Sequence, residues 1–113
     1  MAARLFGSLP WLEEIVKIIA LERELPGTTS EQFNPYLEAE AEKVWQLYQS
    51  ELIRELYFRQ DQSTAVLVLE CDDLQVARAA LDGLPLVQAG LIEFELIALM
   101  PYPGFARLFN KSP

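Results

Sequence analysis

The sequence predicts an α+β domain in which two helices cover one face of a single four-stranded sheet. Strand-like segments lie at residues 14–22, 53–59, 64–70 and 91–99, and helical segments lie at 33–48 and 72–81. The resulting order, β-α-β-β-α-β, is that of the split βαβ or ferredoxin-like unit. The strands are apolar on both faces, and burial on two sides is usual only where both faces are covered. We therefore expect a homodimer, or a ring of dimers, that forms through contact between two sheets.

The first strand is predicted from EIVKIIALE, a nearly continuous apolar run that ends in a turn at Pro26 and Gly27. Ser30 is the predicted N-cap of the first helix, and Pro35 lies near enough to its start to be tolerated. Apolar residues then recur at helical spacing and form a stripe that should face the sheet. They are Phe33, Leu37, Ala41, Val44 and Tyr48.

The central hairpin is predicted from IRELYFR, a turn at residues 61–63, and AVLVLE. Alternation along IRELYFR places Arg54, Leu56 and Phe58 on one face of the sheet. It places Ile53, Glu55, Tyr57 and Arg59 on the other face.

The second helix is expected to be capped by Asp72 or Asp73 and to stop at Gly83. Its inward side should hold Val76, Ala77, Ala80 and Leu81. In the last strand, one face should hold Ile92, Phe94, Leu96 and Ala98. These elements make residues 13–100 one domain, with an N-terminal extension at 1–12.

The aromatic C-terminal arm, residues 101–113, is too apolar for a typical disordered tail. Its anchors are expected to be Tyr102, Phe105, Leu108 and Phe109. Two placements are open: the arm crosses a neighbouring subunit, or it packs on its own sheet.

Composition excludes several classes of function. The 113 residues carry a net charge of −8, which disfavours nucleic acid and anionic membrane surfaces as partners. There is no histidine, so Ser-His-Asp triads and Cys-His pairs are ruled out. The single cysteine, Cys71, is expected to be a small core or edge residue and fits a cytoplasmic location. No Gly-rich phosphate loop or metal-ligand spacing occurs, so neither a cofactor nor a metal is predicted.

The chain from about residue 37 to 103 resembles the muconolactone isomerase family of the dimeric α/β-barrel superfamily. The resemblance lies in IRELYF, the hairpin to AVLVLE, the Leu-Pro-Leu turn, the apolar-acidic last strand and the exit ALMPYP. It implies a sheet paired with a partner's sheet as a dimeric barrel, and proton transfer on a lactone in a pocket between helix and sheet. The chain has Glu55 and Tyr57 where typical members have His and Trp, so the substrate is not carried over.

Glu40 is the main candidate for catalysis, because a carboxylate inside an apolar helix stripe is either partnered or has a raised pKa. A raised pKa would suit a general base. Arg54 is the second candidate: it would either anchor a small anionic organic ligand or neutralise Glu40. Tyr36, Tyr48 and Phe58 are candidate ligand-binding residues, although plain packing is an alternative for each.

Three functions remain open on the sequence alone. The chain could be an acid–base isomerase acting on a small lactone or organic acid, a non-catalytic small-ligand-binding module, or an oligomerisation module on the same fold. Catalysis predicts a pocket that holds Glu40 with a perturbed pKa. A purely structural module predicts a filled core without a pocket.

Overall fold

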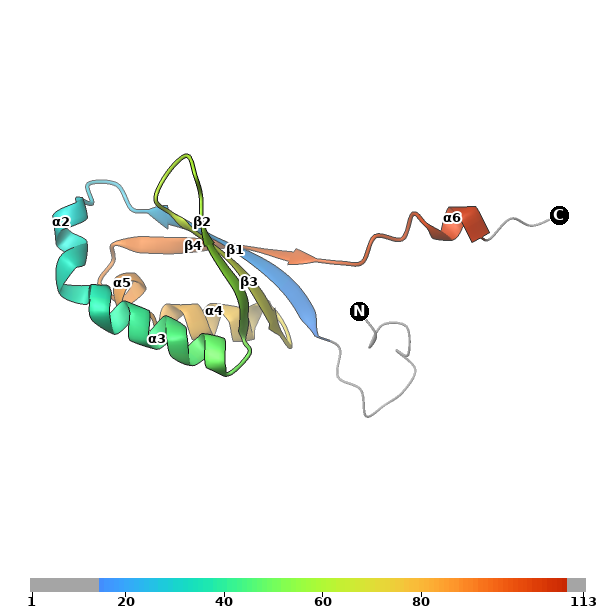
Figure 1. The fold of residues 1–113 in the computed structure, drawn as a ribbon, viewed down its shortest axis with the longest axis horizontal. Helices are drawn as coiled ribbons and strands as arrows, with labels where there is room; N and C mark the ends of the chain where they lie inside the picture. The colour runs from blue at the N-terminus through green and yellow to red at the C-terminus, as the bar shows by residue number, and fades with distance from the viewer. Residues whose placement is uncertain (1–14, 110–113) are drawn as a thin grey trace.

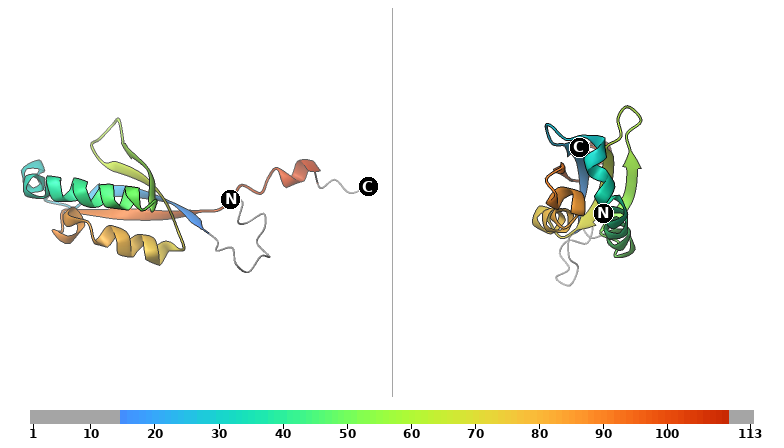
Figure 2. Two further views of the ribbon diagram at one scale, coloured as in Figure 1. Left: turned by 60° about the horizontal axis from the view of Figure 1, so that its bottom comes forward. Right: turned by 90° about the vertical axis from the view of Figure 1, so that its left-hand side faces the viewer.

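The computed structural model describes residues 15–109 and contains one antiparallel sheet with strand order β2-β3-β1-β4. The elements are β1 (Val16–Glu24), α2 (Ser30–Phe33), η1 (Asn34–Tyr36), α3 (Leu37–Gln49), β2 (Ile53–Phe58), β3 (Ala65–Cys71), α4 (Leu74–Asp82), α5 (Pro85–Gln88), β4 (Ile92–Leu99) and α6 (Ala106–Phe109). Helices α3, α4 and α5 lie on the same side of the sheet (Figures 1 and 2). The predicted α+β class is confirmed, and the arrangement is consistent with a small ferredoxin-like fold.

The first helical segment is broken into three pieces instead of the single helix predicted. Helix α2 ends at Phe33, a 3₁₀ turn holds Pro35, and α3 begins at Leu37. Proline lacks an N–H and its ring clashes with the preceding turn, so it interrupts the helix here. The N-cap is Thr29 and not Ser30: the Thr29 N–H donates to Gln32 Oε1 at 2.7 Å in a capping box.

A β-bulge changes the predicted alternation at the start of β2, whereas from Glu55 to Phe58 the register agrees with the prediction. Ile53 pairs with Leu69, whereas Glu55 pairs with Val68, so Arg54 is the extra residue. One inserted residue moves the preceding side chain to the opposite face. Ile53 therefore lies in the core, on the same side as Leu56 and Leu67, and Arg54 leaves the row of inward-facing residues.

The predicted N-cap of the second helix is confirmed, but only part of its predicted inward face is buried. Asp73 Oδ1 accepts from the Val76 N–H at 2.9 Å, which identifies Asp73 as the N-cap of α4. Ala77 and Leu81 are buried, but the Val76 side chain is exposed.

The segment after Gly83, predicted only as a turn, contains α5. That helix ends in a Schellman motif: the N–H of Leu91 donates to Leu86 O, and Gly90 has a φ of 75°.

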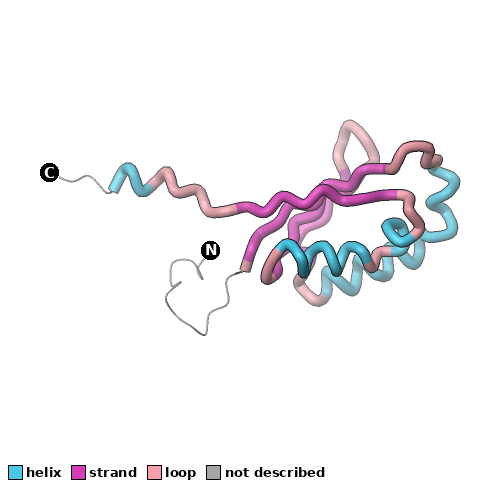
Figure 3. The backbone as a smooth tube through the Cα atoms, turned by 180° about the vertical axis from the view of Figure 1, so that it is seen from behind, coloured by secondary structure: helices cyan, strands magenta, loops and turns pink. Residues whose placement is uncertain are grey.

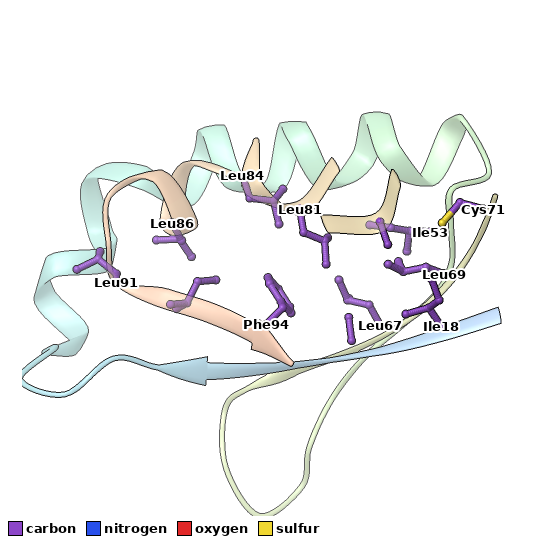
Figure 4. Close-up of a cluster of buried hydrophobic side chains, with 13 residues drawn as sticks. Ile18, Ile53, Leu67, Leu69, Cys71, Leu81, Leu84, Leu86, Leu91 and Phe94 are labelled. Carbon is purple, nitrogen blue, oxygen red and sulfur yellow. The ribbon is translucent and has the colours of Figure 1, made fainter. Parts of the chain in front are cut away.

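The core lies between the sheet and the helices, as Figure 4 shows. It is formed by residues from all four strands and from α4 and α5. They are Ile18, Ala20, Ile53, Leu67, Leu69, Cys71, Ala77, Leu81, Leu84, Leu86, Leu91, Ile92 and Phe94. The burial of Cys71 confirms its expected place in the core.

The opposite side of the sheet carries no helix among the described residues, and we call it the open face. Its strand register aligns apolar side chains, with Ile19 between Val68 and Ile97, and Leu21 beside Val66. Charged pairs flank this apolar centre: Arg23 contacts Glu93 and Glu95, and Lys17 contacts Glu70. The open face is thus an apolar surface with charged margins.

The described part of the C-terminal arm, residues 101–109, leads away from the body of the protein and does not fold back on its own sheet (Figures 1 and 3). It has some order of its own, because the rings of Tyr102 and Phe105 meet edge to face with centroids 5.2 Å apart. The anchors Tyr102, Phe105, Leu108 and Phe109 are all exposed. The predicted extension at residues 1–12 lies outside the described residues.

Candidate functional site

A cavity of about 480 Å³ lies between α3 and the sheet, next to the β2–β3 hairpin. Its volume falls within the range of about 300–1,000 Å³ that is usual for small-molecule sites. The walls come from α2 and α3, from all four strands, and from α5. The lining residues are Glu22, Phe33, Leu37, Glu40, Ala41, Val44, Leu56, Tyr57, Phe58, Ser63, Ala65, Leu67, Leu84, Leu86 and Phe94. We refer to it as the α3 cavity.

The apolar stripe predicted on α3 does not pack fully against the sheet. Val44 packs partly on the core, but Leu37 remains 47% exposed. Together with Ala41, these two residues line the α3 cavity. The stripe from Phe33 to Val44 therefore forms a wall of the cavity.

Glu40 lies in the α3 cavity, as a carboxylate within this stripe should. Its Oε1 accepts a hydrogen bond from the Leu86 N–H at 2.9 Å, in the first turn of α5. Burial raises the pKa of the Glu40 carboxyl above its ordinary value of 4.5. The hydrogen bond from Leu86 opposes this rise, and the negative charge of Glu22 adds to it. Glu40 is thus both a helix cap and a partly desolvated acid.

Glu22 is a second carboxyl group in the same cavity, and the sequence analysis missed it. Its Oε1 accepts from the Ala65 N–H at 2.9 Å, just beyond the last β1–β3 pair. Burial raises the pKa of Glu22 above 4.5, the Ala65 hydrogen bond lowers it in part, and the charge of Glu24 raises it again. A signal was present in the sequence: Glu22 continues the inward row that Ile18 and Ala20 begin along β1.

Arg54 does not join the site. Its guanidinium contacts Glu51 at 3.7 Å, and neither Arg54 nor any other basic residue of the described chain lines the α3 cavity. The bulge explains this, because it removes Arg54 from the inward side of β2. Neutralisation of Glu40 by Arg54, one of the two alternatives for this residue, is therefore not observed in this structure.

Of the three predicted ligand-binding residues, only one lines the α3 cavity. Phe58 lines the α3 cavity together with its neighbours Leu56 and Tyr57. Tyr36 and Tyr48 do not, and Tyr48 instead stacks on Trp45 with centroids 5.8 Å apart. The Tyr57 side chain lies on the open face, in register with Val66, where its hydroxyl donates to Glu55 at 2.7 Å.

Two further findings concern metal binding and membrane-spanning helices. Within residues 15–109, His, Cys, Asp and Glu side chains form no group of three that could hold a metal ion. In the same part of the chain, every helix is too short or too polar to cross a membrane.

No protein-family model and no curated protein matches this chain.

Proposed function

We propose that this protein binds a small, largely apolar molecule in the α3 cavity. The observation that carries this proposal is a cavity of ligand size whose apolar wall is interrupted by two partly buried carboxyl groups, Glu22 and Glu40. Apolar lining with a few convergent polar groups is the usual make-up of a ligand site. A purely structural module would be expected to fill this space with side chains.

A second candidate is acid–base catalysis on a neutral lactone, in line with the resemblance to muconolactone isomerases. The raised pKa of both carboxyls favours it, because a carboxylate with a higher pKa is a stronger base toward a substrate proton. Glu40 would act as the base and Glu22 as the second proton carrier. An organic acid fits less well, since its charge would meet two carboxyl groups without a basic side chain.

We also propose that the protein assembles through its open face into a dimeric α/β barrel. The support is the apolar centre at Ile19, Val68 and Ile97, together with the absence of any described helix on that side. The α3 cavity lies on the other side of the sheet and would stay accessible in such a dimer. The exposed arm supports a further contact with a neighbouring copy, because removing its aromatic side chains from water would lower the free energy.

The ligand-binding proposal is tested by filling the cavity. Ala41→Trp places a large ring in the α3 cavity, whereas Ala39→Trp, at an exposed position on the same helix, is the matched control. Fluorescence titration with the neutral dye Prodan should show binding to the wild type and to Ala39→Trp, but not to Ala41→Trp. Equal binding by all three proteins, or by none, would contradict the proposal.

The catalytic candidate has a separate test. Nuclear magnetic resonance in D₂O would follow exchange of the C–H protons next to the carbonyl of a simple five-membered lactone. Glu40→Gln should abolish any exchange that the wild type catalyses, because the amide cannot accept the proton. Exchange that survives in Glu40→Gln would remove Glu40 as the base.

A further inference from the structure

We propose that the α3 cavity selects a hydrophobic amine, a molecule with an apolar or aromatic body and one protonated amino group. This inference rests on the proposed ligand-binding function and adds the chemical class of the ligand. Three features of the cavity support it: the sign of its charge, the unused oxygens of its two carboxyl groups, and the aromatic rings in its wall.

The first feature is an uncompensated negative charge. Glu22 and Glu40 line the α3 cavity, and no lysine or arginine of the described chain does. Most of the basic side chains are engaged elsewhere. Lys17, Arg23, Arg54 and Arg59 form ion pairs outside the cavity, and Arg78 donates to the Phe94 carbonyl. A cationic ligand would therefore supply the charge that the protein itself does not.

The second feature is the free hydrogen-bonding capacity of the two carboxyl groups. Each uses Oε1 to accept a backbone N–H, from Ala65 for Glu22 and from Leu86 for Glu40. Within residues 15–109, no hydrogen bond reaches Oε2 of either group. An ammonium group has three N–H donors and no acceptor, so it can bind these oxygens without leaving a donor–acceptor mismatch.

The coupling between the carboxyls points the same way. The charge of Glu22 raises the pKa of Glu40, which means that the two negative groups oppose each other's ionisation. A cation bound between them would relieve this repulsion, and a bound anion would add to it. The small anionic organic ligand expected from the sequence depended on Arg54, which lies outside the cavity.

The third feature is the aromatic wall. The rings of Phe33, Phe58 and Phe94 line the α3 cavity. Aromatic faces attract ammonium groups through cation–π interaction, and they also bury the apolar body of a ligand. A wall of this kind combined with two carboxylates suits a molecule that is both hydrophobic and cationic.

A matched series of three probes tests the inference: 3-phenylpropylamine, 3-phenylpropanol and 3-phenylpropanoate. They share one body and differ in the charge of the end group. Binding to the full chain at pH 7.5 is measured by isothermal titration calorimetry. The amine should bind at least about tenfold more tightly than the alcohol, because hydrogen bonds to charged groups are the stronger ones. The propanoate should bind most weakly.

Three variants locate the effect. Glu22→Gln and Glu40→Gln each keep an oxygen that can accept the backbone hydrogen bond. In the double variant, the ratio of the affinity for the amine to the affinity for the alcohol should fall to near one. Glu42→Gln, an exposed position on α3 outside the cavity, makes the same charge change and should keep the preference. Thermal unfolding confirms that each variant is folded.

The possible results distinguish between failure of the cationic-ligand assignment and failure of the ligand site itself. Equal affinity for amine and alcohol, or an amine preference that survives in the double variant, would overturn the assignment of a cationic ligand while leaving a ligand site. Tighter binding of the propanoate would reverse the assignment. Failure of all three probes to bind, together with failure of Prodan, would overturn the ligand site itself.

Discussion

Removing the Glu40 side chain should destabilise the fold, whereas replacing it with glutamine should not. The Glu40 carboxylate accepts the Leu86 N–H at 2.9 Å, and α5 has no cap from its own N-cap residue, Leu84. Glu40→Ala leaves that N–H without its acceptor, which typically costs about 1 kcal/mol, within a range of roughly 0.5–2 kcal/mol. Glu40→Gln keeps an acceptor oxygen and removes a partly desolvated charge, so its stability should equal or exceed that of the wild type at pH 7.5.

The assay is urea unfolding followed by circular dichroism, at pH 7.5 and again at pH 4.5. Because the pKa of Glu40 is raised in the folded state, the folded protein binds the proton more tightly than the unfolded chain does. The stability of the wild type relative to Glu40→Gln should therefore be highest at low pH. It should fall as the pH rises above 4.5 and through the raised pKa.

Glu42→Ala is the control, since its side chain is exposed on the same helix and the change should stay within about 0.5 kcal/mol. Equal losses in Glu40→Ala and Glu40→Gln would show that the cap contributes nothing. A stability difference between wild type and Glu40→Gln that does not vary with pH would refute the desolvation argument.

Three further predictions concern assembly and the core. If the protein forms the proposed dimer, Ile97→Glu on the open face should give a folded monomer in sedimentation velocity, whereas Leu74→Glu, which is similarly exposed but lies on the helix side, should not. A wild-type monomer at micromolar concentration would contradict the proposed dimer. Deleting the residues after Pro101 should lower the melting temperature or the oligomer mass, and an unchanged value of both would show that the arm is dispensable. Leu81→Ala, at a core site with 1% exposure, should cost about 2–5 kcal/mol in urea unfolding, and a loss as small as that of the exposed Leu108→Ala would place Leu81 outside the core.

The fold class could be predicted because hydrophobic pattern and element order agree along most of the chain. The inward row of β4 is a clear case: Ile92 and Phe94 are buried on the side where alternation places them. The patterns were less informative where one residue alters the local geometry. Pro35 splits the first helix, and an extra residue at Arg54 reverses the face of Ile53. A bulge cannot be predicted from hydrophobic alternation, because it is defined by the pairing of β2 with β3.

The candidate site could be predicted only in part, for a similar reason. Glu40 was recognisable because a charge interrupts an apolar stripe within one helix. Its neighbour Glu22 lies on β1, and its proximity depends on how α3 packs over the sheet, which local periodicity does not specify. The exclusion of Arg54 from the site also follows from strand pairing and not from residue type.

The central claim is that Glu22 and Glu40 share one apolar cavity and influence each other's ionisation. The most direct measurement is the pH titration of their side-chain carboxyl ¹³C shifts in the wild type and in Glu22→Gln. We predict that both groups titrate above 4.5 in the wild type, and that Glu22→Gln lowers the pKa of Glu40. Titration of both carboxyls at or below 4.5, or a Glu40 pKa that is unchanged in Glu22→Gln, would contradict the claim.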